Sequence, residues 1–238
     1  MFKQVKQSKA YQDVVDQIQE AIMTGALKAG SLLPAERDLK EKFGISRGTL
    51  REALRVLEQK GLIEIRTGVA GGSMVREVNS DKLSENLGLL IRNCAVSLTD
   101  LAEFREEMEG GVTALAAQRA GAEDVALLRT LLQEAEEQLD LGPAGWDGFI
   151  RIDEQLHLAL AKMSGNLLFQ TVLQSLYANI HTYYVKYLPR DEALLKENFA
   201  DLCAIVTSVE AHDSEQARAV AQSHVRRFNK YMEQKGAQ

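Results

Sequence analysis

A short run of residues near position 50 carries the clearest chemistry in this sequence: Ser46, Arg47, Gly48, Thr49 and Arg51. Arginine presents a planar fork of N–H donors that matches the O6 and N7 acceptors of guanine in the major groove of DNA. Side chains in the first turn of one helix can reach base edges together, because a recognition helix presents its N-terminal residues to the groove. The run therefore indicates base reading, provided that a helix begins at Ser46.

The flanking sequence predicts that helix and a shorter one before it. Pro34 suits the first turn of a helix that runs through Lys42, because proline has no N–H to lose there, and Gly44 ends that helix. Ser46 can cap the second helix by accepting a backbone N–H, and Gly61 closes it. The apolar residues recur at helical spacing in both: Ala35, Leu39 and Phe43, then Leu50, Ala53, Leu54 and Leu57.

A β-hairpin is predicted directly after these two helices. Ile63 and Ile65 alternate with polar neighbours as in a strand, a glycine-rich turn covers residues 68–72, and residues 73–75 can return as the second strand. An amphipathic helix over residues 11–23 precedes the pair and can pack behind it. Together these elements predict a winged helix-turn-helix over residues 1–78.

The charge of the chain divides at the same place. Residues 1–78 contain 13 Lys and Arg against 10 Asp and Glu, a formal charge of +3, whereas residues 79–238 contain 15 against 24, a charge of −9. DNA binding depends on the local density of basic side chains at the contact face rather than on the net charge of the chain. The net charge of −6 is therefore compatible with DNA binding, and the acidic part should face away from DNA.

The rest of the sequence is almost purely helical in pattern. Breaks fall at Gly121, at Gly142-Pro143, at Gly165-Asn166 and at Pro189, and the predicted helices cover residues 81–93, 99–120, 122–140, 146–164, 166–188, 191–210 and 213–235. Seven helices in this length predict a bundle. We expect a mainly α protein: an N-terminal winged helix-turn-helix with a small β-hairpin over 1–78, a linker and first bundle helix over 79–98, and an all-α helical bundle over 99–235.

The stretch from Pro34 to Gly68 reads PAERDLKEKFGISRGTLREALRVLEQKGLIEIRTG and closely resembles the DNA-binding domain of the GntR family of bacterial winged-helix regulators. Gly48 departs from the commoner pattern, in which this position bears a side chain, and it indicates either a close backbone approach to DNA or a tolerated weak spot in the helix. The resemblance implies DNA contacts from Arg37, from Ser46, Arg47, Thr49 and Arg51 on the recognition helix, and from Arg66, Thr67 and Gly68 at the wing tip.

Residues 99–235 resemble the ligand-sensing FCD domain of the FadR-like branch of that family. The likeness rests on DLAEFREEMEGGVTALAAQRA, FIRIDEQLHLALAKMSGN and DSEQARAVAQSHVRRF, in this order. In many members of the branch an aspartate and three histidines hold a divalent metal such as Zn²⁺, often together with a small carboxylate effector. Here the resemblance assigns Asp153, His157 and His224 to that set, but Leu202 stands where the middle histidine would fall.

Two interpretations of this ligand set stay open. Three protein ligands with water and effector oxygens can hold a metal more weakly than four, and His181 can substitute only if its helix turns it into the cavity. Alternatively, Asp153, His157 and His224 make ordinary polar contacts in a metal-free effector cavity, which the leucine at position 202 favours. No cofactor is therefore certain.

Arg105 is a further candidate for binding an acidic effector. An inward-facing arginine can clamp a carboxylate through two parallel hydrogen bonds. The alternative is an ion pair within its own helix to Glu109, four residues later. Among the tyrosines at positions 177, 183, 184 and 187, most should pack in the core, and one or two can line a pocket.

These patterns predict a DNA-binding transcription regulator rather than an enzyme. We expect a homodimeric repressor of metabolic genes that reads a palindromic operator in double-stranded DNA and responds to a small, carboxylate-type effector. The alternatives are a ligand-independent architectural DNA-binding protein and a metal-dependent enzyme, although no nucleophile motif supports the latter.

The sequence has no run long enough for a membrane span and no signal-peptide pattern, so we expect a cytoplasmic protein. Cys94 and Cys203 are too few for a disulfide framework and are expected to be buried and reduced.

Overall fold

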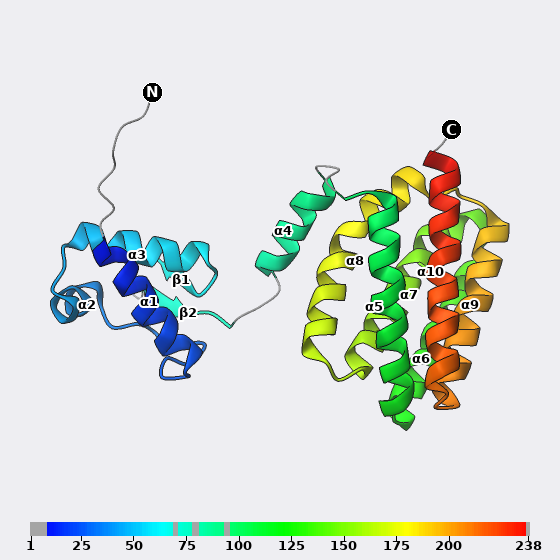
Figure 1. The fold of residues 1–238 in the computed structure, drawn as a ribbon, viewed down its shortest axis with the longest axis horizontal. Helices are drawn as coiled ribbons and strands as arrows, with labels where there is room; N and C mark the ends of the chain where they lie inside the picture. The colour runs from blue at the N-terminus through cyan, green and yellow to red at the C-terminus, as the bar shows by residue number, and fades with distance from the viewer. Residues whose placement is uncertain (1–8, 69–70, 78–80, 93–95, 237–238) are drawn as a thin grey trace. The chain divides into compact units, whose positions relative to one another are not determined.

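The computed structural model describes residues 9–68, 71–77, 81–92 and 96–236 (Figure 1). The chain separates into two compact units, Met1–Lys82 and Leu83–Gln238, and each is described here by itself. The described residues are mostly helical, with one two-stranded hairpin in the first unit. The predicted fold class is confirmed. Within the described part, no helix is both long enough and apolar enough to cross a membrane.

The first unit contains three helices and the hairpin. Strands β1 and β2 pair antiparallel, with Ile63 opposite Val75 and Arg66 opposite Gly72. The elements are α1 (Lys9–Met23), α2 (Glu36–Phe43), α3 (Arg47–Gln59), β1 (Ile63–Arg66) and β2 (Gly72–Val75).

Helix α3 is fixed in place by its apolar side. Leu50, Leu54 and Leu57 are at most 1% exposed, and they belong to one core with Val15 of α1 and Leu39 of α2. The 3.6-residue period that buries these leucines directs the remaining positions of α3 outward. The first turn of α3 is therefore held rigidly while its polar face stays exposed.

Local backbone chemistry sets the ends of α2 and α3. Ser46 caps α3 as predicted, since the backbone N–H of Thr49 donates to its Oγ at 3.1 Å. Helix α2, however, begins at Glu36, and Pro34 lies outside it rather than in its first turn. The reason is that the N–H of Leu33 donates to the carbonyl of Ser73 at 2.7 Å, which keeps this segment extended beside β2.

The tip of the hairpin requires glycine at two described positions. Gly68 has φ +111°, a conformation that residues with a side chain rarely adopt. A Cβ atom on Gly71 would lie 2.4 Å from the carbonyl oxygen of Arg66. These two glycines let the strands turn in the little space available.

The second unit is all helical. Every helix predicted for this part of the sequence is present, and the predicted breaks coincide with the ends of helices. The helices are α4 (Asp81–Arg92), α5 (Leu98–Arg119), α6 (Ala122–Asp140), α7 (Trp146–Met163), α8 (Leu167–Tyr187), α9 (Glu192–Glu210) and α10 (Ser214–Gly236), with a 3-10 turn at Gly142–Gly145.

Side-chain caps begin several of these helices. Ser97 and Asp100 form a reciprocal capping box at the start of α5. The carboxamide oxygen of Asn166 accepts from backbone N–H groups at the start of α8, and Asp191 does the same for α9. Of these caps, Asn166 lies at a predicted break, and the other predicted breaks carry glycine or proline.

Helices α5 and α10 run side by side along much of their length (Figure 1). They approach closely at Gly110, where an added Cβ would lie 2.6 Å from Cγ of Gln222. This contact brings the buried face of α5 next to the turn of α10 that carries His224.

The tyrosines and cysteines of the second unit differ in their environments. Tyr177, Tyr183 and Tyr184 are buried as predicted, and the hydroxyl of Tyr183 donates to the carbonyl of Val96 at 2.9 Å. Cys203 is a free thiol but is half-buried rather than buried, because its position on α9 lies at the edge of the core. The prediction for Cys94 falls outside the described residues.

Candidate functional site

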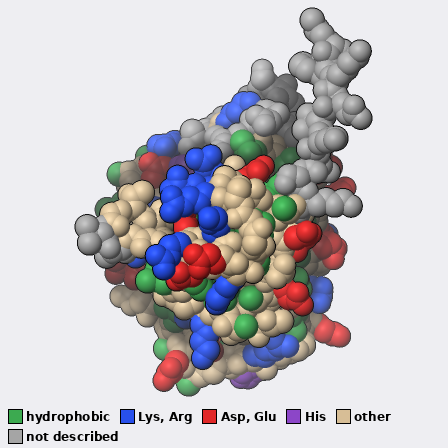
Figure 2. Space-filling model, turned by 90° about the vertical axis from the view of Figure 1, so that its left-hand side faces the viewer, with side chains coloured by type: hydrophobic (Ala, Val, Ile, Leu, Met, Phe, Trp, Pro, Cys, Tyr) green, Lys and Arg blue, Asp and Glu red, His purple; other side chains and the backbone are tan. Residues whose placement is uncertain are grey.

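The first turn of α3 forms an exposed polar surface on the first unit. Ser46, Arg47, Gly48 and Arg51 are exposed, and Thr49 is half-buried. The hydroxyl of Ser46 is shared with its own helix, because Oγ also lies 2.9 Å from Oγ1 of Thr49. Figure 2 shows Lys and Arg side chains gathered on the face toward the viewer, with acidic side chains between them.

The arginines assigned to DNA contact have different partners. Arg51 donates through Nε to Glu36 at 3.2 Å, and Arg66 makes two hydrogen bonds to Glu64, at 3.1 and 3.2 Å. Arg37 lies 3.9 Å from Asp38 and 4.0 Å from Glu41. In the part of the chain that the structure describes, Arg47 has no ion pair. Its guanidinium is thus the most available of the four.

The ion pair of Glu64 and Arg66 at the end of β1 favours the charged form of both side chains. The hydrogen bond from Arg66 lowers the pKa of Glu64, and the hydrogen bond to Glu64 raises the pKa of Arg66. Both side chains are about half exposed, so the pair can exchange for contacts with solvent or phosphate at little cost.

A groove of about 580 Å³ lies between α2, α3 and the hairpin. It is lined by the predicted DNA-contact residues Arg51, Arg66 and Thr67, together with Glu36, the partner of Arg51. Gly68 also lines it. A groove lined by arginines from both α3 and β1 can accommodate a phosphodiester strand.

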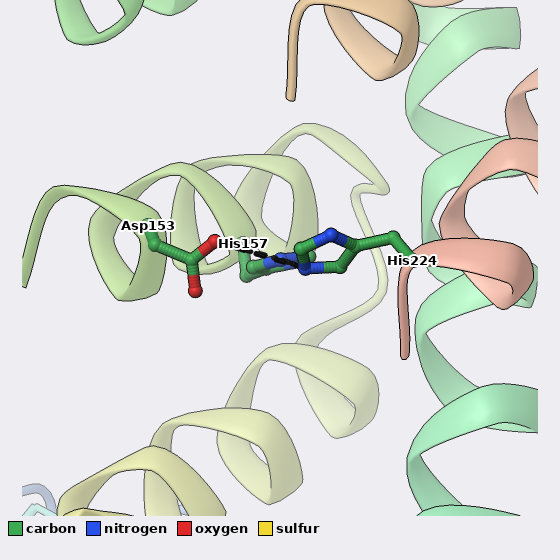
Figure 3. A group of neighbouring side chains, drawn as sticks. All are labelled: Asp153, His157 and His224. Carbon is green, nitrogen blue, oxygen red and sulfur yellow. Dashed lines mark hydrogen bonds and ion pairs between the residues drawn. The ribbon is translucent and has the colours of Figure 1, made fainter. Parts of the chain in front are cut away.

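A second candidate site lies inside the helical unit, where three predicted side chains converge. Asp153 and His157 project from the same face of α7, and His224 reaches them from α10 (Figure 3). The two Nε2 atoms of the histidines lie 3.2 Å apart. Oδ1 of Asp153 lies 3.7 Å from Nε2 of His224 and 3.9 Å from Nε2 of His157. All three side chains are at most 2% exposed.

Arg105 forms an ion pair with Glu109 in its own helix, which is the alternative to an effector clamp that the sequence left open. Its Nε donates to Oε1 of Glu109 at 2.7 Å, and its Nη2 donates to the hydroxyl of Tyr177 at 3.3 Å. Both members of the ion pair are at most 2% exposed. Arg105 therefore reaches His157 through Glu109 and through Tyr177, whose ring stacks on that histidine, and its Nε and Nη2 are already engaged in this arrangement.

Glu109 links the arginine to the histidine pair. Its Oε2 lies 2.9 Å from Nδ1 of His157, close enough to favour a proton on that nitrogen, although the oxygen is off the line of the ring N–H. Burial alone would raise the pKa of Glu109, but Arg105 and then His157 outweigh it and hold that pKa far below its ordinary value. Burial alone would lower the pKa of His157, but Glu109 and Asp153 raise it overall.

His224 has a carboxylate on its other side as well. Its Nδ1 lies 3.5 Å from Oδ2 of Asp201 on α9, and Oδ1 of the same carboxylate lies 3.1 Å from Arg227. The histidine pair thus sits between two carboxylates, each of which is itself paired with an arginine.

The donor set fits a divalent metal ion. One ligand atom from each of Asp153, His157 and His224 lies within 4.8 Å of the others. Two nitrogens bound about 2.0–2.1 Å from one ion lie about 3.0–3.4 Å apart, which includes the distance between the two Nε2 atoms. Oδ1 of Asp153 is buried without a hydrogen-bond partner among the described residues, so a cation there would satisfy it.

The remaining candidates do not join this cluster. Leu202 is fully buried on α9 and supplies no ligand. His181 is exposed and lines a separate cavity of about 120 Å³ together with Ile150, Tyr184 and Arg190, so it does not replace the missing histidine. Asn198, one turn before Leu202, is buried with both amide atoms unpaired among the described side chains.

Sequence reasoning missed two members of this site. The sequence indicates Glu109 only as a partner for Arg105, and it gives no sign of a role for Asp201. Glu109 lies four residues after Arg105, and Asp201 directly precedes Leu202. No local spacing, however, connects Glu109 to α7 or Asp201 to α10. The one available signal was the run of carboxylates on α5, of which a single member, Glu109, is fully buried.

Residues 10–71 match the family described as bacterial regulatory proteins, gntR family, and residues 100–227 match the FCD domain. The transcriptional repressor NanR of Escherichia coli (strain K12) is 27% identical over 220 residues, which cover 89% of this chain and 80% of NanR. NanR of Shigella flexneri gives the same values. The structure of Streptococcus agalactiae GntR superposes with a TM-score of 0.69 at 22% identity, covering 92% of this chain and 99% of that one, which shows a common fold.

Proposed function

This chain belongs to the GntR family of bacterial regulatory proteins, in the FadR-like branch that carries an FCD domain, and we propose that it is a homodimeric repressor of metabolic genes. We further propose that a small organic acid or related metabolite, bound in the helical unit, controls how tightly it holds its operator. The family and the relatives are transcription regulators, not enzymes. A DNA-binding role would place the protein in the bacterial cytoplasm.

The observation that carries the proposal is the coexistence of two sites in one chain. An exposed helix start bearing Arg47 and Arg51 suits contact with base edges. A fully buried cluster of Asp153, His157 and His224 suits a ligand, because such groups are costly to bury unless something satisfies them. We assign residues 1–78 to DNA reading, 79–98 to the connection and 99–235 to sensing.

Repression and dimerisation are supported by analogy and by geometry. The E. coli relative is a repressor by name. One winged module reads only a few base pairs, so two copies related by a two-fold axis would read a palindrome with greater affinity and specificity. Wing contacts from Arg66, Thr67 and Gly68 and a phosphate contact from Arg37 would add affinity without reading sequence.

The effector would bind near the buried cluster. A divalent metal held by Asp153, His157 and His224 would supply the positive charge that a carboxylate ligand needs, because Arg105 is already paired with Glu109. Effector binding then needs to favour a protein arrangement with poorer operator contact by only about 1–3 kcal/mol, which changes operator occupancy several-fold or more.

A ligand screen tests this proposal. Thermal unfolding is measured with a panel of small organic acids, with and without added Zn²⁺, and each compound that stabilises the protein is added to a preformed protein–operator complex. The proposal expects at least one stabilising acid to release operator DNA, since a ligand that binds only the folded protein raises its apparent stability. Stabilisation without any effect on DNA binding would contradict the proposed control, and sedimentation would report a monomer if the dimer is wrong.

A further inference from the structure

The two histidines of the buried cluster are arranged alike. Each directs Nε2 toward the other and Nδ1 toward a carboxylate, Glu109 for His157 at 2.9 Å and Asp201 for His224 at 3.5 Å. The two carboxylates come from helices that contribute no ligand atom to the cluster, α5 and α9. Four helices therefore meet at one pair of imidazoles.

A carboxylate at Nδ1 selects one form of the ring. It favours the tautomer that carries its proton on Nδ1, which leaves a lone pair on Nε2. With both rings in that form, two lone pairs would face each other at 3.2 Å, beside a carboxylate oxygen of Asp153 that accepts no hydrogen bond among the described residues. This arrangement is repulsive by itself, and a cation between the three atoms would satisfy all of them.

Each of these carboxylates is held in place by an arginine. Arg105 donates to Glu109 at 2.7 Å in the core, where both are at most 2% exposed. Arg227 lies 3.1 Å from Asp201, whose side chain is 13% exposed. The arginines fix each carboxylate against its histidine and reduce its tendency to bind a metal directly.

We propose that Glu109 and Asp201 are positioning residues, which hold the Nε2 lone pairs of His157 and His224 toward a divalent metal ion bound by these histidines and Asp153. The inference rests on the proposed sensing function of this site and extends it to residues beyond the ligands. Glu109 lies closer to its histidine than Asp201 does and is more deeply buried. Loss of Glu109 should therefore reduce metal affinity more than loss of Asp201.

A purely structural role would give a different result. If Glu109 served only to neutralise Arg105, replacing it would lower the stability of the protein with and without metal and would leave the metal affinity of the folded protein unchanged. A positioning role changes the metal affinity itself, since loss of such a partner weakens metal binding about 10–100-fold.

The test is a titration with Co²⁺, followed by its visible absorption, on full-length protein freed of metal with a chelator. The variants are Glu109→Gln and Asp201→Asn, and the matched control is Glu107→Gln, which removes an exposed carboxylate from the same helix. We expect affinity for Co²⁺ to fall about 10–100-fold in both variants, more for Glu109→Gln, and to stay at the wild-type value in the control. Circular dichroism of the metal-free proteins reports folding.

Asp201→Asn decides the outcome if Glu109→Gln fails to fold, because Asp201 lies near the surface and its loss leaves Arg227 partly solvated. Wild-type Co²⁺ affinity in folded Asp201→Asn would overturn the proposal for that residue, and absence of Co²⁺ binding to the wild-type protein would overturn it altogether. Operator binding by the same wild-type sample is measured in parallel. Intact DNA binding without Co²⁺ binding would reject the positioning role while leaving the regulator assignment in place.

Discussion

Nε2 of His157 and Nε2 of His224 lie 3.2 Å apart, although the two residues are 67 positions apart in the sequence. The contact forms because α7 and α10 both face the centre of the helical unit, where α5 packs against each of them. Among the described residues, the side chains that contact this pair are buried or nearly so, and the Asp201 carboxylate at 13% is the most exposed of them. A change in ligation here would therefore be felt by four helices at once.

Arg47→Ala should weaken operator binding by about 1–3 kcal/mol if the guanidinium reads a base. Arg47 is exposed at the start of α3, and no ion pair competes for it within the described residues. Fluorescence anisotropy with labelled operator measures the change, and Lys28→Ala, which removes an exposed positive charge after α1, serves as the control. Wild-type affinity in folded Arg47→Ala would remove this residue from the interface.

Arg66→Ala should weaken binding to all DNA sequences alike and reduce the salt dependence of binding by about one unit of slope, because one phosphate contact is lost. Binding constants at several salt concentrations, for operator and for random DNA, give that slope. A slope equal to that of the wild type would place Arg66 away from the phosphates.

Glu64→Gln should have the opposite effect on non-specific binding. Glu64 accepts two hydrogen bonds from Arg66. Glutamine keeps one acceptor oxygen, so the substitution loosens the guanidinium and deletes a negative charge beside DNA. We expect tighter binding to random DNA and a smaller ratio of specific to non-specific affinity. Weaker binding to random DNA would mean that the pair is needed to hold Arg66 in position.

Gly48→Ala separates the two interpretations of the glycine in the recognition helix. A Cβ atom there meets only Oγ of Ser46, at 3.7 Å, which is ordinary contact, so the folded protein should accept alanine and gain up to about 1 kcal/mol of stability. If thermal stability rises while operator affinity falls, the backbone at Gly48 approaches DNA closely. If operator affinity is unchanged, Gly48 is a tolerated weak spot.

Leu202→His should strengthen metal binding if a metal is held by Asp153, His157 and His224. Leu202 is buried next to Asp201, which contacts His224, and imidazole would supply the donor that this chain lacks. Co²⁺ titration measures the effect, with Ile205→His, a buried residue on the same helix, as the control. Equal affinities in Leu202→His and the wild type would show that position 202 does not face the ion.

Much of this architecture follows from local signals in the sequence. Ser46, Asn166 and Asp191 cap their helices through short-range hydrogen bonds, and the spacing of Asp153 and His157 puts both on one face of α7. The predicted start of α2 is wrong because the true start depends on Leu33 pairing with Ser73, which is 40 positions away in the chain. Long-range pairing of this kind leaves no mark on local residue preference.

The same distinction separates the predicted and the missed parts of the buried site. The i,i+4 pair of Arg105 and Glu109 was visible as one of two possibilities, but only burial on α5 settles which applies. The contact of Glu109 with His157 and that of Asp201 with His224 depend on how four helices pack, and helices separated by turns can pack in more than one register. Such contacts require the tertiary structure.

The most direct test of the regulator assignment is selection of binding sites from random duplex DNA by the purified full-length protein. The account predicts enrichment of a two-fold-symmetric sequence, with half-sites separated by a constant spacing, and loss of that enrichment in Arg47→Ala. Recovery of no preferred sequence by the folded wild-type protein would contradict sequence-specific reading by α3, and with it the central claim.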